Sequence, residues 1–464
     1  MNWRPTRTFH TYTKLCNSSS APFNNLGGIL SQLGKISGQL PQLARKWRES
    51  SFGDAIRNEV FNVRDDQISS SHYKRPTQPT GVPFSKLLSN SFPLSVAESV
   101  RDYKDRHQVL RFQDELLSTL PFYPEMDATG RVAKVLLVPV YGISAPRATD
   151  YINEFCIYPP GKTEADFADL NHLVVVHGYG AGLGFFLKNF EGLSSGFEAG
   201  LKPWVVHAID LLGYGCSSRP EFHYPKVEDQ SQQLEITESW FHDSFEQWRV
   251  QRGLTNPENI LCCSHSLGAY LSATYCMAYP KRFKKLMMVS PAGIIKHRTP
   301  KPVPAWFDYL WNKNISPFVL VRKTGPLGSL FVSGWTYRRF SKLASLFEKQ
   351  KLHKYTYGIF NAKGSGEYIL NYVLAAGANP RFPLLERLSQ KMAERRDVIN
   401  CDYTWVYGKD DWMDVHGGEL CSKLINEQTG HQSTVVEVPD CGHHIYLDNV
   451  EAFNKLVVDE MKKF

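Results

Sequence analysis

The chain has 464 residues, of which 42% are hydrophobic and 13% aromatic, and it contains no run of 18 apolar residues. This composition excludes a wholly disordered chain and an ordinary transmembrane helix, but it leaves attachment to a membrane surface open. The nine cysteines are odd in number, include the adjacent pair Cys262 and Cys263, and form no CxxC pair. We therefore expect reduced thiols rather than a disulfide framework.

The positive charge is concentrated at the start of the chain. Residues 1–48 carry seven basic residues and no acidic one, whereas residues 49–464 hold 46 of each. A basic, acid-free segment rich in serine and threonine is typical of a mitochondrial transit peptide. We predict such a segment over 1–48, with a disordered basic tail as the alternative, and a polar linker or surface extension over 49–95.

After a helical stretch at 96–120, short apolar runs alternate with helical patterns along much of the chain. Eight runs have the length of strands: 132–138, 151–158, 173–176, 204–209, 259–263, 285–289, 403–407 and 435–438. This alternation predicts βα units and a mostly parallel sheet with helices on both faces. It stops between 293 and 397, where we predict a helical cap inserted between two core segments, 96–292 and 398–464.

One serine lies at the junction of a predicted strand and a predicted helix, in the sequence Cys263-Ser264-His265-Ser266-Leu267-Gly268. A nucleophile elbow places serine on a strained strand-to-helix turn, so the residues two positions away on each side must be small. Gly268 meets this requirement, and Ser264 stands where glycine is usual. The pattern predicts Ser266 as the nucleophile, with a chance Ser/Gly turn as the alternative.

An acid and a histidine follow two later strands. Asp411 lies after the strand 403–407, and His443 lies after the strand 435–438. Serine, acid and histidine in this order, each at the carboxyl end of a strand, is the arrangement of an α/β-hydrolase. In such a triad the imidazole takes the serine proton while the carboxylate fixes its tautomer.

Neighbouring residues compete for both roles. Asp410 and Asp414 flank Asp411, which has the usual offset from the preceding glycine. His444 adjoins His443, which directly follows a glycine. We predict the catalytic set Ser266, Asp411 and His443.

A glycine-rich loop, His177–Gly182, follows the strand 173–176. Stabilising a tetrahedral oxyanion requires two preorganised N–H donors, and the backbone amides of Tyr179 and Leu267 are the candidates. A loop of this kind could instead hold phosphate, but neither G-x-G-x-x-G nor G-x-x-x-x-G-K-[ST] is present in it.

Residues 170–464 resemble the α/β-hydrolase subfamily of lipid acylhydrolases and acyltransferases that includes the fungal mitochondrial cardiolipin-specific deacylase. Four stretches carry the resemblance: 210–220, 290–293, 325–329 and the box His443-x4-Asp448. The resemblance implies an α/β-hydrolase fold and a serine enzyme of phospholipid acyl esters, with no metal or organic cofactor. Cys216 departs from it, because a basic residue is common at that position in the family.

The predicted cap is strongly basic. Residues 296–354 contain twelve basic and two acidic residues, a net charge of +10, interleaved with aromatic residues. Each Lys or Arg near an anionic bilayer contributes about 1 kcal/mol of attraction, and Trp and Tyr favour the headgroup level. We predict that the cap docks on an anionic, cardiolipin-rich membrane, the alternative being an ordinary cap with solvated lysines. No nucleic-acid-binding module is recognisable.

Together these observations predict a serine acylhydrolase bound peripherally to the mitochondrial inner membrane, converting cardiolipin to monolyso-cardiolipin. Two rival functions stay open. The first is acyl-CoA-dependent transfer to a lysophospholipid, because the His-x4-Asp box has been taken as an acyltransferase signature in some relatives. The second is a non-catalytic adaptor that binds lipid and activates a lipase.

Overall fold

The structure is a computed structural model, and it describes residues 93–195, 202–296, 303, 305–341, 345–394 and 397–464. All of these belong to one contact-defined unit, Asn58–Phe464. The predicted transit segment, 1–48, and nearly all of the predicted linker, 49–95, lie outside the described residues.

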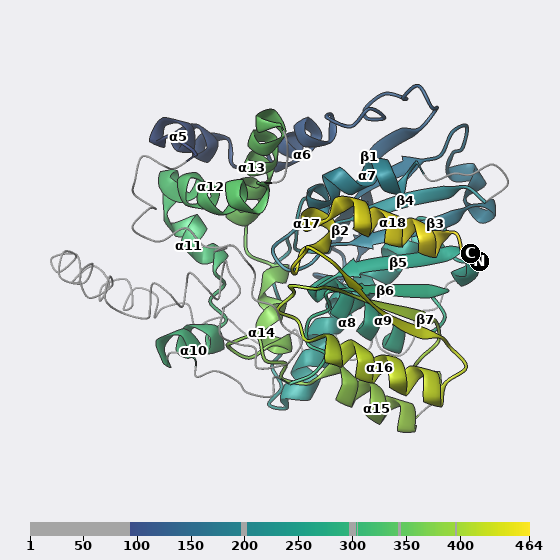
Figure 1. The fold of residues 1–464 in the computed structure, drawn as a ribbon. Coiled ribbons are helices and arrows are strands. Elements are labelled where there is room, and N and C mark those ends of the chain that lie inside the picture. The colour runs from purple at the N-terminus through teal and green to yellow at the C-terminus, as the bar shows by residue number, and fades with distance from the viewer. Residues whose placement is uncertain (1–92, 196–201, 297–302, 304, 342–344, 395–396) are drawn as a thin grey trace. The chain divides into compact units, whose positions relative to one another are not determined.

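An eight-stranded sheet forms the core, in the order β1-β2-β4-β3-β5-β6-β7-β8 (Figure 1). Its strands are β1 Val132–Tyr141, β2 Thr149–Tyr158, β3 Asn171–Val176, β4 Trp204–Ile209, β5 Ile260–His265, β6 Lys285–Val289, β7 Asp402–Gly408 and β8 Ser433–Val438. The β1–β2 and β2–β4 pairs are antiparallel and all the others are parallel. The predicted strands and the mostly parallel sheet are thus confirmed, with strand ends within three residues of those expected.

The central strands are fully buried, which explains their composition. Every residue of β3, β4 and β5 is buried. Parallel strands covered by helices on both faces are apolar throughout rather than alternating. The runs Leu173–Val176 and Ile260–Cys263 therefore lack a polar face, and each ends at the polar residues that lead into the site.

Helices cover both faces of this sheet. The longer ones are α5 Val96–Asp105, α6 Val109–Leu117, α7 Leu187–Leu193, α8 Gln230–Gln251, α9 Leu267–Ala278, α10 Ala305–Asn312, α11 Phe318–Lys323, α12 Gly328–Arg339, α13 Leu346–Asn361, α15 Leu384–Glu394, α16 Val415–Gln428 and α18 Val450–Met461. The four-residue helices are α14 Leu370–Val373 and α17 Ile445–Asp448. The 3-10 turns are η3 Glu164–Asp169, η4 Leu183–Phe186, η5 Pro257–Asn259, η6 Gly325–Leu327 and η7 Gly366–Ile369.

The two faces have separate apolar cores. Helices α8, α9 and α16 pack on one face, where Trp240, Ala269 and Ile425 belong to a single buried cluster. Helices α6, α7 and α18 pack on the other, where Phe190 and Val457 belong to a second cluster. This doubly covered sheet fixes the loops at the carboxyl ends of its strands.

Helices of the predicted cap region lie beside that end of the sheet, at the left of Figure 1. The ring of Phe318, on α11, stacks on Tyr179 in the loop after β3, with ring centroids 5.5 Å apart. The predicted helical stretch 96–120 consists of two helices. Helix α5 packs against α12, and α6 packs against α13. At the other end of the region, α15 packs beside α16 of the core. Among the described residues, none of the helices has both the length and the apolar character needed to cross a membrane.

Candidate active site

Ser266 occupies a strained turn between β5 and α9. Its backbone has φ 53° and ψ −116°, a conformation that non-glycine residues rarely adopt, and its amide donates to the carbonyl of Val289 at 2.9 Å. A Cβ at Gly268 would lie 2.2 Å from the carbonyl oxygen of His177, so only glycine allows α9 to approach that loop so closely. This is the geometry that a nucleophile elbow requires.

The unusual Ser264 also has a structural explanation. Its side chain is fully buried, and its hydroxyl lies 2.7 Å from the hydroxyl of Ser272 on α9. A buried hydroxyl is unfavourable unless it is hydrogen-bonded. Ser272 therefore makes serine acceptable where the family pattern has glycine.

The structure brings the three predicted catalytic side chains together. The Nε2 atom of His443 lies 3.0 Å from the Oγ atom of Ser266, and its Nδ1 atom lies 3.2 Å from the Oδ1 atom of Asp411. An ionised carboxylate only accepts hydrogen bonds, so Nδ1–H donates to Asp411 and Nε2 is left with a lone pair. The imidazole is then oriented to accept the serine proton.

The neighbouring acids have other contacts. Asp414 is the N-cap of α16, where its carboxylate accepts from the amide of His416 at 3.0 Å. The backbone amide of Asp410 donates to the carbonyl of Cys441. Asp411 is buried, and its Oδ2 atom finds no hydrogen-bond donor among the described residues. Within the described part of the chain, Asp411 is the one of these three acids that contacts His443.

The competing histidine lies behind His443. The ring of His444 is 5.2 Å from that of His443, and burial holds the pKa of His444 well below its ordinary value. A third histidine, His265, has its Nε2 atom 2.9 Å from the carbonyl oxygen of His443. Because a carbonyl oxygen only accepts, His265 carries its proton on Nε2 and anchors the backbone of the catalytic histidine.

The two predicted oxyanion donors flank Ser266. Neither the amide of Tyr179 nor that of Leu267 donates a hydrogen bond to an acceptor within the described part of the chain. His177 fixes the first of them: its Nε2 accepts from the amide of Leu211 at 3.1 Å, so Nδ1 carries the proton and donates to the carbonyl of Gly178 at 2.7 Å. Because the peptide unit is planar and trans, holding the Gly178 carbonyl also fixes the direction of the Tyr179 N–H.

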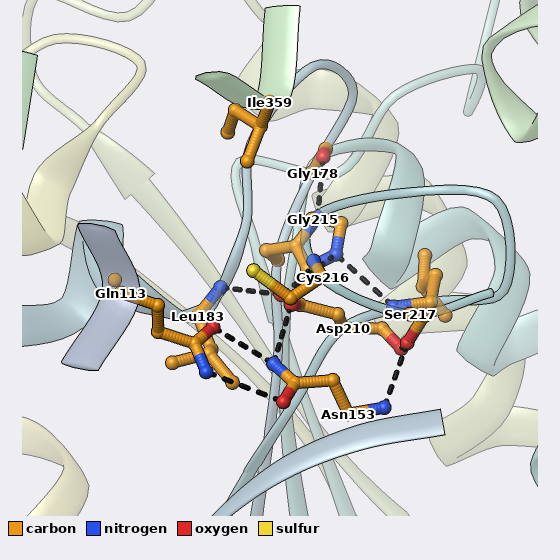
Figure 2. A network of polar contacts seen from close by, with 12 residues as sticks. Gln113, Asn153, Gly178, Leu183, Asp210, Gly215, Cys216, Ser217 and Ile359 are labelled. Atoms are coloured by element: carbon orange, nitrogen blue, oxygen red, sulfur yellow. Dashed lines mark hydrogen bonds and ion pairs between the residues drawn. The ribbon is translucent and has the colours of Figure 1, made fainter. Parts of the chain in front are cut away.

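Asp210 holds this loop from below, as Figure 2 shows. Its buried carboxylate accepts from the amides of Leu183 and Cys216 and from the side-chain amide of Asn153, each at 2.7 Å. Burial raises the pKa of Asp210, while these donors favour its charged form. A Cβ at Gly215, whose φ is +48°, would lie 2.1 Å from the Asp210 carboxyl carbon. The sequence alone does not reveal this role of Asp210, and its one signal there is an acid directly after an apolar strand.

A small hollow opens next to the oxyanion loop. It is lined by Gly180, Ala181, Tyr214, Arg219, Phe318, Ile359, Phe360 and Glu367. It lies between the loop after β3 and the cap helices α11 and α13, and its lining includes the charged Arg219 and Glu367. Its accessible volume of about 10 Å³ is no larger than one water molecule needs.

Two of the twelve basic residues counted in the cap region, Arg322 and Arg339, form ion pairs within the protein. Arg322 lies with both terminal guanidinium nitrogens on the carboxylate of Glu367, the shorter distance being 2.6 Å. Arg339 lies 3.2 Å from Asp448, the acid of the His-x4-Asp box. That acid also accepts from the amide of Gly442 at 3.1 Å. The box acid therefore holds the histidine loop to the cap, and Asp411 pairs with the histidine.

One buried group of described residues has the geometry of metal ligands: Glu154, Cys156 and His207. The carboxylate of Glu154 already contacts His207 Nδ1 at 2.7 Å, Trp248 Nε1 at 2.9 Å and Arg252 Nε at 2.8 Å. The arginine supplies a positive charge where a metal would have to bind. This group is therefore an internal ion-pair network.

Comparison with known proteins agrees with this geometry. Residues 171–450, more than half of the chain, match the family described as alpha/beta hydrolase fold. The chain is 34% identical over 307 residues to a rice (Oryza sativa subsp. japonica) protein named probable 1-acylglycerol-3-phosphate O-acyltransferase, covering 63% of this chain and 67% of that protein. It is 31% identical over 295 residues to the human (lyso)-N-acylphosphatidylethanolamine lipase, covering 62% of this chain and 78% of that protein.

Among solved structures, the naproxen esterase of Bacillus subtilis aligns with 76% of this chain and 96% of its own length, at 15% identity and with a TM-score of 0.48. The family match, the eight-stranded sheet and the serine at its elbow agree with one another, and the chain belongs to the α/β-hydrolase family.

Proposed function

We propose that this protein is a serine hydrolase that deacylates a phospholipid. The proposal depends on one observation, the continuous contact from Ser266 through His443 to Asp411 at 3.0 and 3.2 Å. Ser266 attacks the acyl ester carbonyl while His443 takes its proton. His443 then returns that proton to the departing alcohol, and water releases the acyl group from Ser266 in the second half of the reaction.

Two further groups of residues support this chemistry. The amides of Tyr179 and Leu267 stabilise the negative charge on the carbonyl oxygen, since neither donates to another acceptor among the described residues and the Gly178–Tyr179 peptide is held by His177. Asp411 stabilises the imidazolium that forms on His443. All of these groups belong to the chain itself, so the proposal includes no metal and no organic cofactor.

The substrate class follows from the relatives and the cap. The rice and human relatives are named for reactions of glycerophospholipids. Within that class we propose cardiolipin as the first substrate, with monolyso-cardiolipin as product, on the strength of the resemblance to the mitochondrial deacylase. The mitochondrial location belongs to the same proposal and depends on the acid-free composition of residues 1–48.

Exposed residues of the cap between 309 and 327 support membrane attachment. The apolar ones are Tyr309, Leu310, Ile315, Leu320 and Leu327, and the lysines are Lys313 and Lys323. Aliphatic side chains next to lysines suit an anionic bilayer, where the apolar groups insert and the ammonium groups meet phosphates. We propose these residues, named here the docking surface, as the contact with the inner membrane. Helix α11 carries Leu320 on this surface and Phe318 against the oxyanion loop.

Acyl transfer to a lysophospholipid is the second candidate function, because the rice relative is named an acyltransferase. The two reactions share the acyl-enzyme and differ only in whether water or a lipid hydroxyl accepts the acyl group. The pairing of Asp448 with Arg339 and Gly442 gives the box acid a role that both reactions can use.

The test follows the acyl group. The full chain is given cardiolipin with a labelled acyl chain, and then acyl-CoA together with lysophosphatidic acid. We expect free fatty acid and monolyso-cardiolipin from the first and little acylated product from the second. Acylated product without free fatty acid would establish transfer instead, and no turnover of any acyl ester would favour a lipid-binding adaptor.

Ser266→Ala is the matching variant. It should lose both turnover and labelling by a fluorophosphonate, since the attacking oxygen is gone. Ser290→Ala is its control, because Ser290 is also a buried serine with positive φ at the end of a strand, β6. The control should be labelled like the native chain; equal labelling of Ser266→Ala would refute the assignment.

A further inference from the structure

Arg339 connects the cap to the loop of the catalytic histidine. It is the last residue of α12, and its Nη1 atom lies 3.2 Å from Oδ1 of Asp448. The other oxygen of Asp448 accepts from the amide of Gly442 at 3.1 Å, and His443 follows directly. A ligand that contacts Arg339 is therefore connected to the loop of the general base.

The remaining donors of Arg339 are unused. Its Nε and Nη2 atoms are shielded from solvent and find no acceptor among the described residues. These two nitrogens form one edge of the guanidinium, with N–H bonds that match two oxygens of one phosphate. Buried donors are almost always hydrogen-bonded in proteins, so this edge indicates an acceptor that the described chain does not supply.

The surroundings of this edge favour an anion. The hydroxyl of Tyr446 is fully buried, lies within electrostatic reach of Arg339, and finds no partner among the described residues. The adjacent Arg338 has its Nε and Nη1 atoms in the same condition, shielded and without an acceptor in the described structure.

We propose that the free edge of Arg339, with the hydroxyl of Tyr446, binds the phosphate of the substrate headgroup. This inference rests on the proposed function and names the part of the substrate that the cap recognises. Arg339 binds Asp448 with Nη1 and the phosphate with Nε and Nη2. A bound headgroup is then coupled to the histidine loop by the contacts from Arg339 to Asp448 and from Asp448 to Gly442. Binding of the phosphate by Arg339 lets the cap distinguish phospholipids from neutral esters.

The experiment compares two substrates of the full chain in neutral detergent micelles: a 1-acylglycerol 3-phosphate and the 1-acylglycerol with the same acyl chain. The measured quantity is the KM ratio, the KM of the 1-acylglycerol 3-phosphate divided by the KM of the 1-acylglycerol. Arg339→Gln should raise the KM of the 1-acylglycerol 3-phosphate relative to that of the 1-acylglycerol by about 10- to 100-fold, since two charged hydrogen bonds to the phosphate are lost. Arg339→Lys, which keeps the charge but not the planar edge, should raise it less.

Two variants separate binding from a purely structural role. Asp448→Asn keeps an oxygen for the Gly442 amide but removes the charge that pairs with Arg339, and Lys354→Gln removes an exposed cap cation elsewhere. Lys354→Gln should leave the KM ratio at its native value. Asp448→Asn, which weakens the hold on the histidine loop, should lower kcat for both substrates without raising the ratio. If Asp448→Asn raises the ratio as much as Arg339→Gln does, or if Arg339→Gln leaves it unchanged, Arg339 only holds the loop and the proposal is overturned.

A binding measurement keeps the test independent of turnover. Calorimetry with glycerol 3-phosphate should give an affinity that Arg339→Gln lowers by the same factor, even if neither ester is hydrolysed and the proposed function fails. Equal affinities for the native chain and Arg339→Gln would overturn the proposal. Inorganic phosphate is the second ligand, and binding as tight as that of glycerol 3-phosphate would assign the site to free phosphate instead of a headgroup.

Discussion

Asp411 determines which tautomer His443 adopts. Its Oδ1 atom accepts from His443 Nδ1 and from the amide of Met413 at 3.0 Å, so both the acid and the ring have a fixed orientation. An asparagine at this position can offer its amide to Nδ1, which would move the ring proton to Nε2 and remove the acceptor for the serine proton.

We therefore expect Asp411→Asn to lower kcat by about 10⁴-fold, the size of effect seen when a triad acid is replaced in this way. Asp410→Asn and Asp414→Asn are its controls, because neither carboxylate is recorded in contact with His443, and both should cost far less. Steady-state turnover of a soluble ester with each variant measures this. A larger loss in Asp414→Asn than in Asp411→Asn would show that the assigned acid is the wrong one.

The roles of residues at strand ends were readable from the sequence. Ser266, Asp411 and His443 each follow an apolar run at a characteristic spacing, and the structure brings them within hydrogen-bonding distance. The roles of Asp210 and Arg339 could not be predicted, because neither residue belongs to a motif whose spacing identifies its partner. Only the folded packing shows that Asp210 meets Asn153, or that Arg339 meets Asp448.

At the scale of elements, the close approach of α9 to the loop after β3 builds the oxyanion site. Gly268 is the contact point, since its position leaves no room for a side chain beside the His177 carbonyl. Any displacement of α9 separates the Leu267 amide from the Tyr179 amide, and two donors must converge on one oxygen.

We expect Gly268→Ala to lower kcat by about 100-fold, comparable to losing one oxyanion donor. It should also destabilise the fold by about 1–3 kcal/mol, as overpacking does. Gly430→Ala is the matched control, because a Cβ there meets no atom within 4 Å. Ester turnover and thermal unfolding of both variants measure the effects, and a fully active Gly268→Ala would contradict this account of the turn.

The cap helices are less uniformly basic at their surface than the charge count predicted. Twelve cations in residues 296–354 suggested a uniformly basic surface, yet Arg322 and Arg339 form ion pairs with Glu367 and Asp448. A charge pattern does not say which side of a helix faces solvent. The exposed side of α11 presents Leu320 and Lys323, so the docking surface is part apolar and part cationic.

The docking surface gives a prediction with two components. Replacing Leu320, Leu327 and Lys323 together with Gln should weaken binding to cardiolipin-containing vesicles by roughly 2–4 kcal/mol, summing partial burial of two leucines and one lysine contact. High salt should remove only the lysine part, because screening acts on charges. Vesicle cosedimentation at low and high salt measures this, with soluble-ester turnover as internal reference.

Val250→Gln is the control for that experiment. Val250 is also an exposed aliphatic residue, with 51% of its surface accessible, but it lies on α8 of the core. It should leave vesicle binding at the native level. Loss of binding in Val250→Gln, or none in the triple variant, would place the membrane contact elsewhere.

At the scale of the whole molecule, the fold was largely predictable because its pattern is regular. Buried parallel strands are apolar throughout, so β3 to β6 were recognisable as short runs, and the intervening helices implied crossovers. The sequence did not predict which helices pack with the cap and which pack on the sheet. Helices α5 and α6 precede the sheet in the chain but pack on α12 and α13. Asp102 and Ser99 of α5 accept hydrogen bonds from Ser329 and Leu330 of α12, whereas α6 buries apolar residues.

Residues 1–48 carry the whole net charge of +7, so their removal leaves a chain of balanced charge. The shortened protein should keep its soluble-ester turnover, since every assigned catalytic group lies beyond residue 170, and should no longer enter mitochondria. Import into isolated organelles measures the second effect. Import of the shortened chain at the native rate would move the targeting signal into the rest of the sequence.

The Asp210 network also bears on the order in which the protein is assembled during synthesis. All three donors to the Asp210 carboxylate come from residues 153–216, whereas Ser266, the cap, Asp411 and His443 follow later in the chain. The residues that hold the oxyanion loop are therefore all synthesised before the nucleophile, and the acid and the base are synthesised only after the cap. Because domains generally fold as units, the triad can form only after His443, close to the end of the chain, has been synthesised.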